Sequence, residues 1–246
     1  MDLTIILDSV NSDSGKSHDF TMRFVPNLIL EKNAEYYIAL DSCTMHYLWY
    51  NISSQYNNNT IAYTVNGNPQ TTYTIPDGVY TYEELATLLN VQMNISSNTV
   101  DEQYISLIFD TTNYRVRITL NNVTLHFNQG KFHSLLGFDN GDVSGSASGT
   151  HIPNITNSID EIQIHCSLIS DSIVSGRSSD ILHSFGTATL ERSFPFKIEP
   201  RRALFNKINS HDINKIRIYI TDTLGRPIDL NEIPISLTLI LRKNIL

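Results

Sequence analysis

Histidines are the side chains of this sequence with the widest chemical range, because they bind metals and move protons near neutral pH. The sequence has eight of them: His18, His46, His126, His133, His151, His165, His183 and His211. No pair has the H-x-x-x-H spacing and no C-x-x-C pair is present, so the ligand spacings of common zinc sites are missing. We predict no metal site. We expect His46 and His165, which lie in strand-like segments, to be satisfied by hydrogen bonds.

The small-residue segment 142–150 contains candidate serine nucleophiles, because Ser144, Ser146 and Ser148 alternate there with Gly and Ala. A nucleophile elbow needs G-x-S-x-G between a strand and a helix. This segment lacks that context. We therefore predict that residues 142–150 form a flexible loop.

Paired carboxylates are the remaining candidates for acid–base chemistry. Glu83-Glu84 and Asp160-Glu161 are each adjacent in the sequence. Glu84 also has a structural role in a helix cap, described below, and both pairs have the pattern of structural residues. We predict no catalytic residue, no cofactor and no enzyme activity.

The composition is that of a globular protein with an acidic balance. Of the 246 residues, 41% are hydrophobic and 17% are charged, and the formal net charge is -8. Binding to phosphate backbones needs a surplus of Lys and Arg, so we expect no specific nucleic-acid binding. No run approaches the ~18 apolar residues of a transmembrane helix, and the first residues lack the basic flank of a signal peptide. We expect neither membrane insertion nor secretion through a signal peptide.

Two cysteines, Cys43 and Cys166, lie in apolar, strand-like runs. They could pair only if the fold brought those strands together, and the sequence leaves this open. We favour two buried thiols in a reducing compartment.

The hydrophobic pattern predicts many strands. Residues 213–221 and 235–242 are rich in β-branched side chains and partly alternate apolar with polar residues, which is typical of strands. Residues 60–65 and 71–75 flank Asn66-Gly67, a strong hairpin signal. The long run 36–50 alternates imperfectly, so we expect a bulge near Asp41.

One helix is predicted after Thr81, which forms a capping box with Glu84. Apolar residues then recur at helical spacing: Leu85, Leu88, Leu89 and Met93. A short apolar turn, residues 132–136, ends at the helix-stop residue Gly137.

The pattern as a whole predicts an all-β protein, a single jelly-roll β-sandwich with one or two short helices. We find no linker and no internal repeat. We therefore predict one domain over residues 1–246, with loop insertions and no separable second domain.

Several segments carry a family resemblance when they are taken in order. They are F-T-M-R-F-V-P-N-L-I-L at 20–30, Y-Y-I-A-L at 36–40, L-W-Y-N-I at 48–52, G-V-Y-T-Y-E-E-L at 78–85, L-N at 89–90, L-L-G-F at 135–138, I-Q-I-H-C-S-L at 162–168, I-R-I-Y-I-T-D at 216–222, G-R at 225–226 and L-T-L-I-L-R at 237–242. Their order and spacing resemble the minor capsid proteins of Polintons (Mavericks), which are similar to the penton proteins of virophages and adintoviruses. The resemblance covers most of the chain.

This resemblance implies a single jelly roll that forms pentamers at the vertices of an icosahedral shell. The implied partners are copies of the chain itself and major capsid proteins of the double-jelly-roll type. The implied location is the virion, after synthesis inside the host cell. We find no long insertion of the kind that some relatives use for a projecting domain or for fibre docking.

Four residues are candidates for subunit contacts: Trp49, Arg201, Arg202 and Arg226. Trp49 lies beside Tyr47 at a strand end, where it can either fill the sandwich or face a partner. The doublet Arg201-Arg202 is either a solvated loop pair or a salt-bridging contact to a neighbouring subunit, because Arg is enriched at interfaces. Arg226, in a Gly-Arg-Pro turn, has the same two interpretations.

Two other classes of protein remain as alternatives. A ligand-binding jelly-roll module, lectin-like or of the trimeric signalling type, would be expected to carry a signal peptide or a disulfide framework, and neither is visible. A cupin-type metal enzyme could gather ligands from separated strands, but the missing ligand spacing disfavours it.

Overall fold

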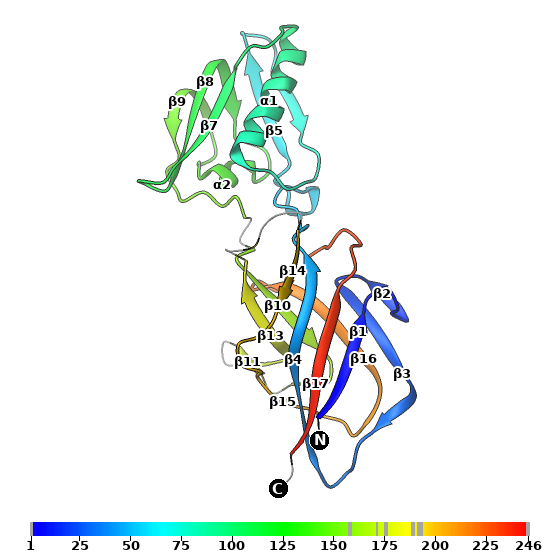
Figure 1. Ribbon diagram of the computed structural model, residues 1–246. Helices are drawn as coiled ribbons and strands as arrows, with labels where there is room; N and C mark the ends of the chain where they lie inside the picture. Colours follow the sequence, from blue (N-terminus) through cyan, green and yellow to red (C-terminus); the bar gives the residue numbers. More distant parts are fainter. Residues whose placement is uncertain are drawn as a thin grey trace. The chain divides into compact units, whose positions relative to one another are not determined.

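The computed structural model describes residues 2–156, 159–170, 172–174, 177–187, 190 and 194–244. The chain divides into two compact units (Figure 1). Unit 1 is Met1–Trp49 with Ile159–Leu246, and unit 2 is Tyr50–Ser158. Unit 2 is therefore a contiguous segment inserted into unit 1.

The described residues of unit 1 form two large antiparallel sheets and one small hairpin. The first sheet has the order β1 (Asp2–Asp8), β17 (Ser236–Asn244), β4 (Glu35–His46) and β14 (Pro195–Ile198), with β15 (Asn206–Lys207) also paired to β4. The second sheet has the order β13 (Ile181–Gly186), β10 (Glu161–Cys166), β16 (Asp212–Asp222), β3 (Asp19–Ile29) and β2 (Ser14–Lys16). The hairpin pairs β11 (Ser172–Val174) with β12 (Arg177–Ser179).

The strand order of unit 1 is that of a jelly roll. Its eight principal strands follow in the chain order β1, β3, β4, β10, β13, β14, β16 and β17. The first sheet contains the first, eighth, third and sixth of these strands, and the second contains the second, seventh, fourth and fifth. Most connections therefore cross between the sheets, as in two Greek keys. The predicted all-β jelly-roll fold is confirmed.

The core of unit 1 lies between the sheets, because alternate side chains of a strand point to opposite faces. In β16, Ile216, Ile218 and Ile220 are buried. Arg217 and Tyr219 have the opposite parity and lie on the other face of the sheet. The predicted alternation of this strand is confirmed.

A bulge in β4 keeps one face of this long strand toward the core. The pairing with β17 shifts register at Asp41, as predicted. Even-numbered Ile38 and Leu40 are buried before the shift, and odd-numbered Cys43 and Met45 are buried after it. The extra residue thus moves the core-facing positions from even to odd residue numbers. The hydrophobic pattern of the sequence changes at the same place.

Unit 2 has its own sheet and helices. Its sheet has the order β6 (Thr71–Thr74), β5 (Thr60–Val65), β8 (Arg115–His126) and β7 (Ile105–Asp110), with β9 (Asp142–Ser148) also paired to β8. The helices are α1 (Tyr82–Ser97), α2 (Phe132–Leu136) and the 3-10 turn η1 (Ser54–Tyr56). The hairpin predicted around Asn66-Gly67 joins β5 to β6, and α2 ends at Gly137 with a left-handed φ of 74°, also as predicted.

Helix α1 begins at the predicted capping box. The Glu84 N–H donates to the Thr81 hydroxyl over 3.1 Å, and the Thr81 N–H donates to the Glu84 carboxylate over 2.7 Å. Leu85, Leu89 and Met93 are fully buried in a core with the sheet of unit 2. This core includes Ile61, Ile118 and Phe132, all within unit 2.

The two-unit organisation differs from the single domain expected over residues 1–246, and unit 2 is a long insertion that sequence patterns did not reveal. Unit 2 has a separate core. It is inserted between β4 and β10 without a Gly-rich or Pro-rich linker, so neither junction differs in composition from its surroundings. Composition alone therefore could not mark the boundary.

The loop predicted for residues 142–150 is wrong, because residues Asp142–Ser148 form strand β9. Backbone pairing with β8, from Arg117 opposite Ser148 to His126 opposite Asp142, overrides the low strand propensity of Ser and Gly. Val143 and Ala147 pack against the core of unit 2. No helix of the described residues is long and apolar enough to span a membrane.

Candidate interaction surfaces

Metal-ligating side chains do not gather in the part of the chain that the structure describes. No group of three or more His, Cys, Asp or Glu side chains there could share a metal ion. Cys43 and Cys166 are free and buried, and burial raises the pKa of each thiol to about 12. The preference for two buried thiols is confirmed.

His165 belongs to a hydrogen-bonded cluster on the outer face of the second sheet. Its Nδ1 lies 2.8 Å from the Asp180 carboxylate and its Nε2 lies 2.9 Å from the Thr221 hydroxyl. The Tyr219 hydroxyl donates to the two Asp180 oxygens over 3.0 and 2.8 Å. His165 therefore has hydrogen-bond partners at both ring nitrogens, as predicted. His46 differs, because its Nδ1 is buried and has no partner among the described residues.

The cluster continues along β16 to an ion pair. Arg217 lies over the Tyr219 ring at 4.7 Å and donates two hydrogen bonds of 2.7 Å to Asp19. Burial, followed by the hydrogen bond to Asp180, raises the pKa of Tyr219 to about 12, so this phenol stays protonated near neutral pH. The cluster joins β10, β16 and β3 by polar contacts.

Trp49 lies in the interior and not on a free surface. Its exposed fraction is 2%. Its ring packs against Tyr47 at 4.1 Å and edge-on against Phe196 at 6.4 Å. Of the two interpretations left open by the sequence, the structure favours a residue that fills the sandwich.

Arg226 also has an internal role. The buried carboxylate of Asp222 accepts hydrogen bonds from the Arg226 N–H at 2.8 Å and from its Nε at 2.5 Å. The same carboxylate accepts the Leu224 N–H at 2.9 Å. Arg226 therefore neutralises a buried charge in the turn after β16, and its side chain is one-third exposed.

Arg201 and Arg202 are exposed on one edge of the first sheet. They lie in the connection from β14 to β15, and both of these strands pair with β4. Leu204 in the same connection and Phe194 just before β14 are 59% and 62% exposed. We call these four residues the β14 flank.

The opposite edge of the first sheet is β1, and it also exposes apolar side chains. Leu3, Ile6 and Val10 are 45%, 69% and 66% exposed. Asp8 and Asp13 lie on the same strand and in the loop that follows it. We call these five residues the β1 flank. The sequence does not show that β1 forms an edge of the sheet, so this surface was missed.

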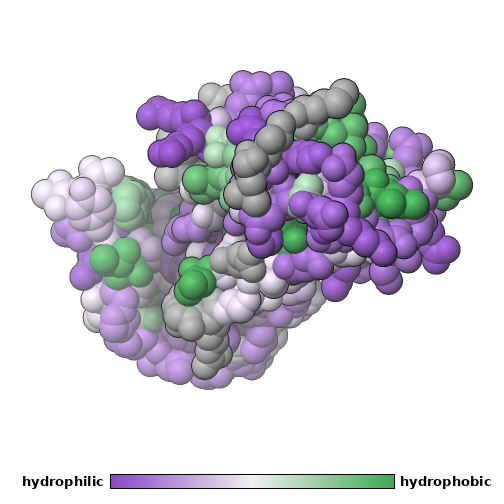
Figure 2. Space-filling model, turned by 90° about the horizontal axis from the view of Figure 1, so that it is seen from below, coloured by the Kyte–Doolittle hydropathy of each residue, from purple (hydrophilic) through white to green (hydrophobic). Residues whose placement is uncertain are grey.

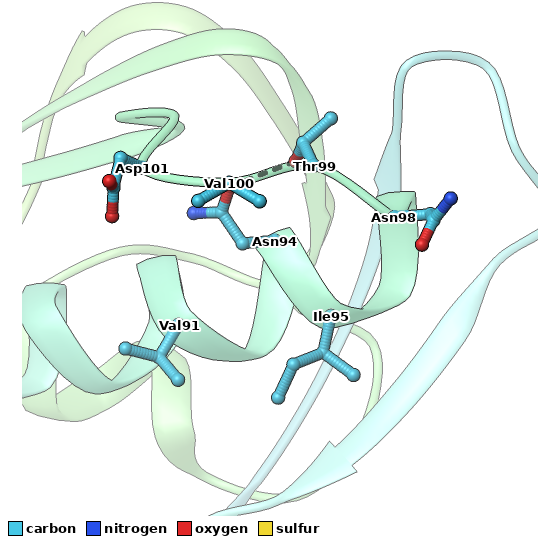
Figure 3. Close-up of a pocket in the computed structure, with 7 residues that line it drawn as sticks. All are labelled: Val91, Asn94, Ile95, Asn98, Thr99, Val100 and Asp101. Atoms are coloured by element: carbon cyan, nitrogen blue, oxygen red, sulfur yellow. Dashed lines mark hydrogen bonds between the residues drawn. The ribbon is translucent and has the colours of Figure 1, made fainter.

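The face of the molecule shown in Figure 2 has hydrophobic areas (green) that are small and separated by hydrophilic residues (purple). In unit 2, a groove of about 420 Å³ lies beside the end of α1. Figure 3 shows Val91 and Ile95 projecting from the helix, with Asn94 bonded to Thr99 above them. Val91 and Ile95 are 55% and 68% exposed.

A second groove, of about 560 Å³, lies between α1 and β7. Asn90 of α1 is part of its lining, and this residue also binds the backbone of β7. Its side-chain oxygen accepts the Tyr104 and Ile105 N–H groups at 2.7 and 2.9 Å, and its Nδ2 donates to the Ile105 carbonyl at 2.8 Å. Asn90 was not among the residues predicted to have a functional role. The available signal was two asparagines, Asn90 and Asn94, one turn apart in an apolar helix.

The fold of this chain is similar to that of a known protein, although its sequence matches none of the families or curated proteins compared. No family model and no curated protein matches the sequence. The crystal structure of the selenomethionine-labelled penton protein of mavirus has a TM-score of 0.51 with this chain at 10% sequence identity. The match covers 99% of this chain and 100% of that chain. This chain has a penton-like fold. Because almost the whole of both chains matches, the penton-like fold includes the inserted unit 2 as well as the jelly roll.

Proposed function

We propose that this protein is a structural subunit of a viral capsid that forms the pentameric vertices, or pentons, of an icosahedral shell. The observation that carries the proposal is the match to the mavirus penton protein over nearly the full length of both chains. The sequence resemblance to Polinton-type minor capsid proteins supports the same assignment.

The two edges of the first sheet fit the kind of contact that closes a ring. A ring of identical subunits is built from heterologous contacts, in which two different patches of each subunit meet. The β14 flank has the basic doublet Arg201-Arg202, and the β1 flank has Asp8 and Asp13. Both flanks also expose apolar side chains. In the proposed ring, the β14 flank of one subunit meets the β1 flank of the next.

The remaining parts of the assignment follow from the same proposal. The vertex ring is surrounded by major capsid proteins of the double-jelly-roll type, and the protein is part of the virion. Its role is structural, without catalytic activity, cofactor or specific nucleic-acid binding. The acidic balance of the chain supports the last point.

The experiment that tests the proposal is the native mass of the purified protein by light scattering after size exclusion. A species of five times the chain mass, or a larger particle built from it, supports the vertex assignment. A trimer would favour the alternative, a ligand-binding jelly-roll module. A monomer that stays monomeric after mixing with a double-jelly-roll major capsid protein would contradict the capsid proposal.

A further inference from the structure

The outer edge of β7 in unit 2 has unpaired backbone groups in a defined register. β7 is the last strand of its sheet, and β8 is its neighbour on the inner side. The N–H and C=O of Ile105 both bind the side chain of Asn90, so they point away from β8. In an antiparallel pair, alternate residues point their backbone groups to the same side. Leu107 and Phe109 therefore also point theirs outward.

Two backbone hydrogen bonds confirm this register from the other strand. The Asn121 N–H donates to the Tyr104 carbonyl at 2.9 Å, which makes these two residues a hydrogen-bonded pair. The Gly149 N–H donates to the Val116 carbonyl at 2.9 Å, so Val116 points its carbonyl away from its partner on β7. No hydrogen bond of the described residues engages the outward groups of Leu107 or Phe109.

The groove between α1 and β7 follows this open edge. Its lining includes Leu107 and Phe109 from one face of β7, Ser106 and Ile108 from the other, and Ala86 and Thr87 from α1. Side chains from both faces of a strand border the same groove only when the groove runs along the edge of that strand. An exposed edge beside a helix is the arrangement that accepts an added strand, because the backbone supplies hydrogen bonds and the groove accepts alternate side chains.

The charges around the groove indicate which kind of extended segment would bind there. Glu83 is part of the lining, Glu102 directly precedes Gln103 of the lining, and Asp110 ends β7. We call these three residues the acidic rim. Residues 33–114 contain no Lys or Arg. The basic residues that pair with β7 are Arg115 and Arg117 of β8, which lie opposite Asp110 and Ile108. β7 thus separates them from the open edge.

We propose that the β7 edge of unit 2 binds an extended segment of a partner protein that alternates basic with apolar residues. The segment pairs with the outward backbone groups of Leu107 and Phe109, and its basic side chains face the acidic rim. A second copy of this chain fits less well, because two acidic rims would meet. This inference goes beyond the penton assignment and does not depend on it.

The test is peptide binding to the full-length protein at low salt. The probe is an eight-residue peptide that alternates lysine with valine, capped at both ends and labelled with a fluorophore. The first control replaces every lysine by glutamate. The second control methylates alternate backbone nitrogens of the lysine peptide, in one register and then in the other. Since about two backbone hydrogen bonds are lost, methylation in the register that faces β7 should weaken binding about tenfold or more.

A matched pair of variants separates the backbone from the side chain. Phe109→Ala removes the ring and keeps the N–H, whereas Phe109→Pro removes both. Proline is tolerated on an edge strand where the N–H faces outward. Circular dichroism checks that both variants are folded. Because one backbone hydrogen bond is lost, we expect the proline variant to bind the lysine peptide about two- to tenfold more weakly than the alanine variant.

Three results of the peptide assay would overturn the proposal. They are no binding of the lysine peptide, equal binding of the glutamate peptide, and an affinity that neither backbone methylation nor Phe109→Pro changes. A fall in the native mass of the protein on Phe109→Pro would also overturn it, since the edge would then pair with a second copy. The native mass tests the penton assignment separately, so the two proposals can fail independently.

Discussion

The imidazole of His165 stacks on the ring of Tyr219, with centroids 4.2 Å apart and planes at 8°. Both residues also bind the carboxylate of Asp180, which precedes β13. The contact therefore joins β10, β16 and the start of β13 on the outer face of the jelly roll. Its contribution to stability is open to direct measurement.

Tyr219→Phe removes the two hydrogen bonds to Asp180 and keeps the ring stack. We expect unit 1 to lose about 1–2 kcal/mol of unfolding free energy, because a hydrogen-bonded carboxylate loses its donor. Urea unfolding followed by fluorescence measures this, since Trp49 is the one tryptophan and lies in unit 1. Tyr114→Phe is the control, as Tyr114 is 62% exposed. An equal effect of both substitutions would contradict the role of the cluster.

Asn90→Ala should loosen the start of β7. The substitution leaves three backbone groups of Tyr104 and Ile105 without their partner, and we expect a cost of about 2–3 kcal/mol. Hydrogen exchange at the amides of Tyr104 and Ile105 measures the local effect, and we expect both amides to exchange faster in the variant. Val91→Ala on the same helix is the control, since Val91 is more than half exposed. Unchanged exchange in the Asn90 variant would show that the side chain does not hold the strand.

Acidification should destabilise unit 1 in part through His183. Burial lowers the pKa of this half-buried histidine below its usual 6.5. As the pH falls through 6.5, the unfolded chain takes up a proton that the folded chain does not, so stability falls. His18 acts in the same direction, also through burial.

The measurement is the urea midpoint of Trp49 fluorescence at about pH 7 and about pH 5. His183→Gln should show a smaller difference between the two midpoints than the unchanged protein. A difference of the same size in both proteins would exclude His183 as a source of the pH dependence.

The proposed ring contact predicts that Arg201→Glu with Arg202→Glu weakens assembly. The substitutions place acidic groups opposite Asp8 and Asp13, and like charges at an interface cost several kcal/mol. Light scattering over a concentration series should show dissociation at a concentration about tenfold or more above that of the unchanged protein. Lys32→Glu, at an exposed turn, is the control. Identical curves for all three proteins would place the ring contact elsewhere.

Ile6→Asp tests the other side of the same contact. Ile6 is 69% exposed on the edge strand β1, so the change should leave the folded subunit intact. Within an apolar contact, however, it would bury an unpaired charge. We expect loss of the ring in light scattering with an unchanged circular dichroism spectrum. Val91→Asp, on exposed α1, should leave the mass unchanged.

Much of the fold follows from local signals in the sequence. The capping box at Thr81, the Asn66-Gly67 hairpin and the parity change at Asp41 each depend on neighbouring residues, and each is present in the structure. Strand β9 was missed because its stability comes from pairing with β8, whose paired residues lie well outside its own sequence neighbourhood, from Arg117 opposite Ser148 to His126 opposite Asp142. Local propensity does not contain that information.

The candidate interaction residues were harder to predict for a related reason. Trp and Arg are residue types that are common at interfaces, yet here both have partners within the chain. Trp49 packs against Phe196, and Arg226 donates a hydrogen bond to Asp222. The open edges at β1 and β7 depend on strand order, which one sequence does not specify. Arg201 and Arg202 alone among the four candidates are exposed in the structure.

The position of β17 between β1 and β4 has a consequence for synthesis on the ribosome. The first sheet of the jelly roll lacks its central strand until residues 236–244 have left the exit tunnel. Unit 2 has all its strands by residue 148 and can fold as a unit while translation continues. Until then, the edges of β1 and β4 that pair with β17 lack their partner. We therefore expect nascent chains to fold the inserted unit first and to close the jelly roll last.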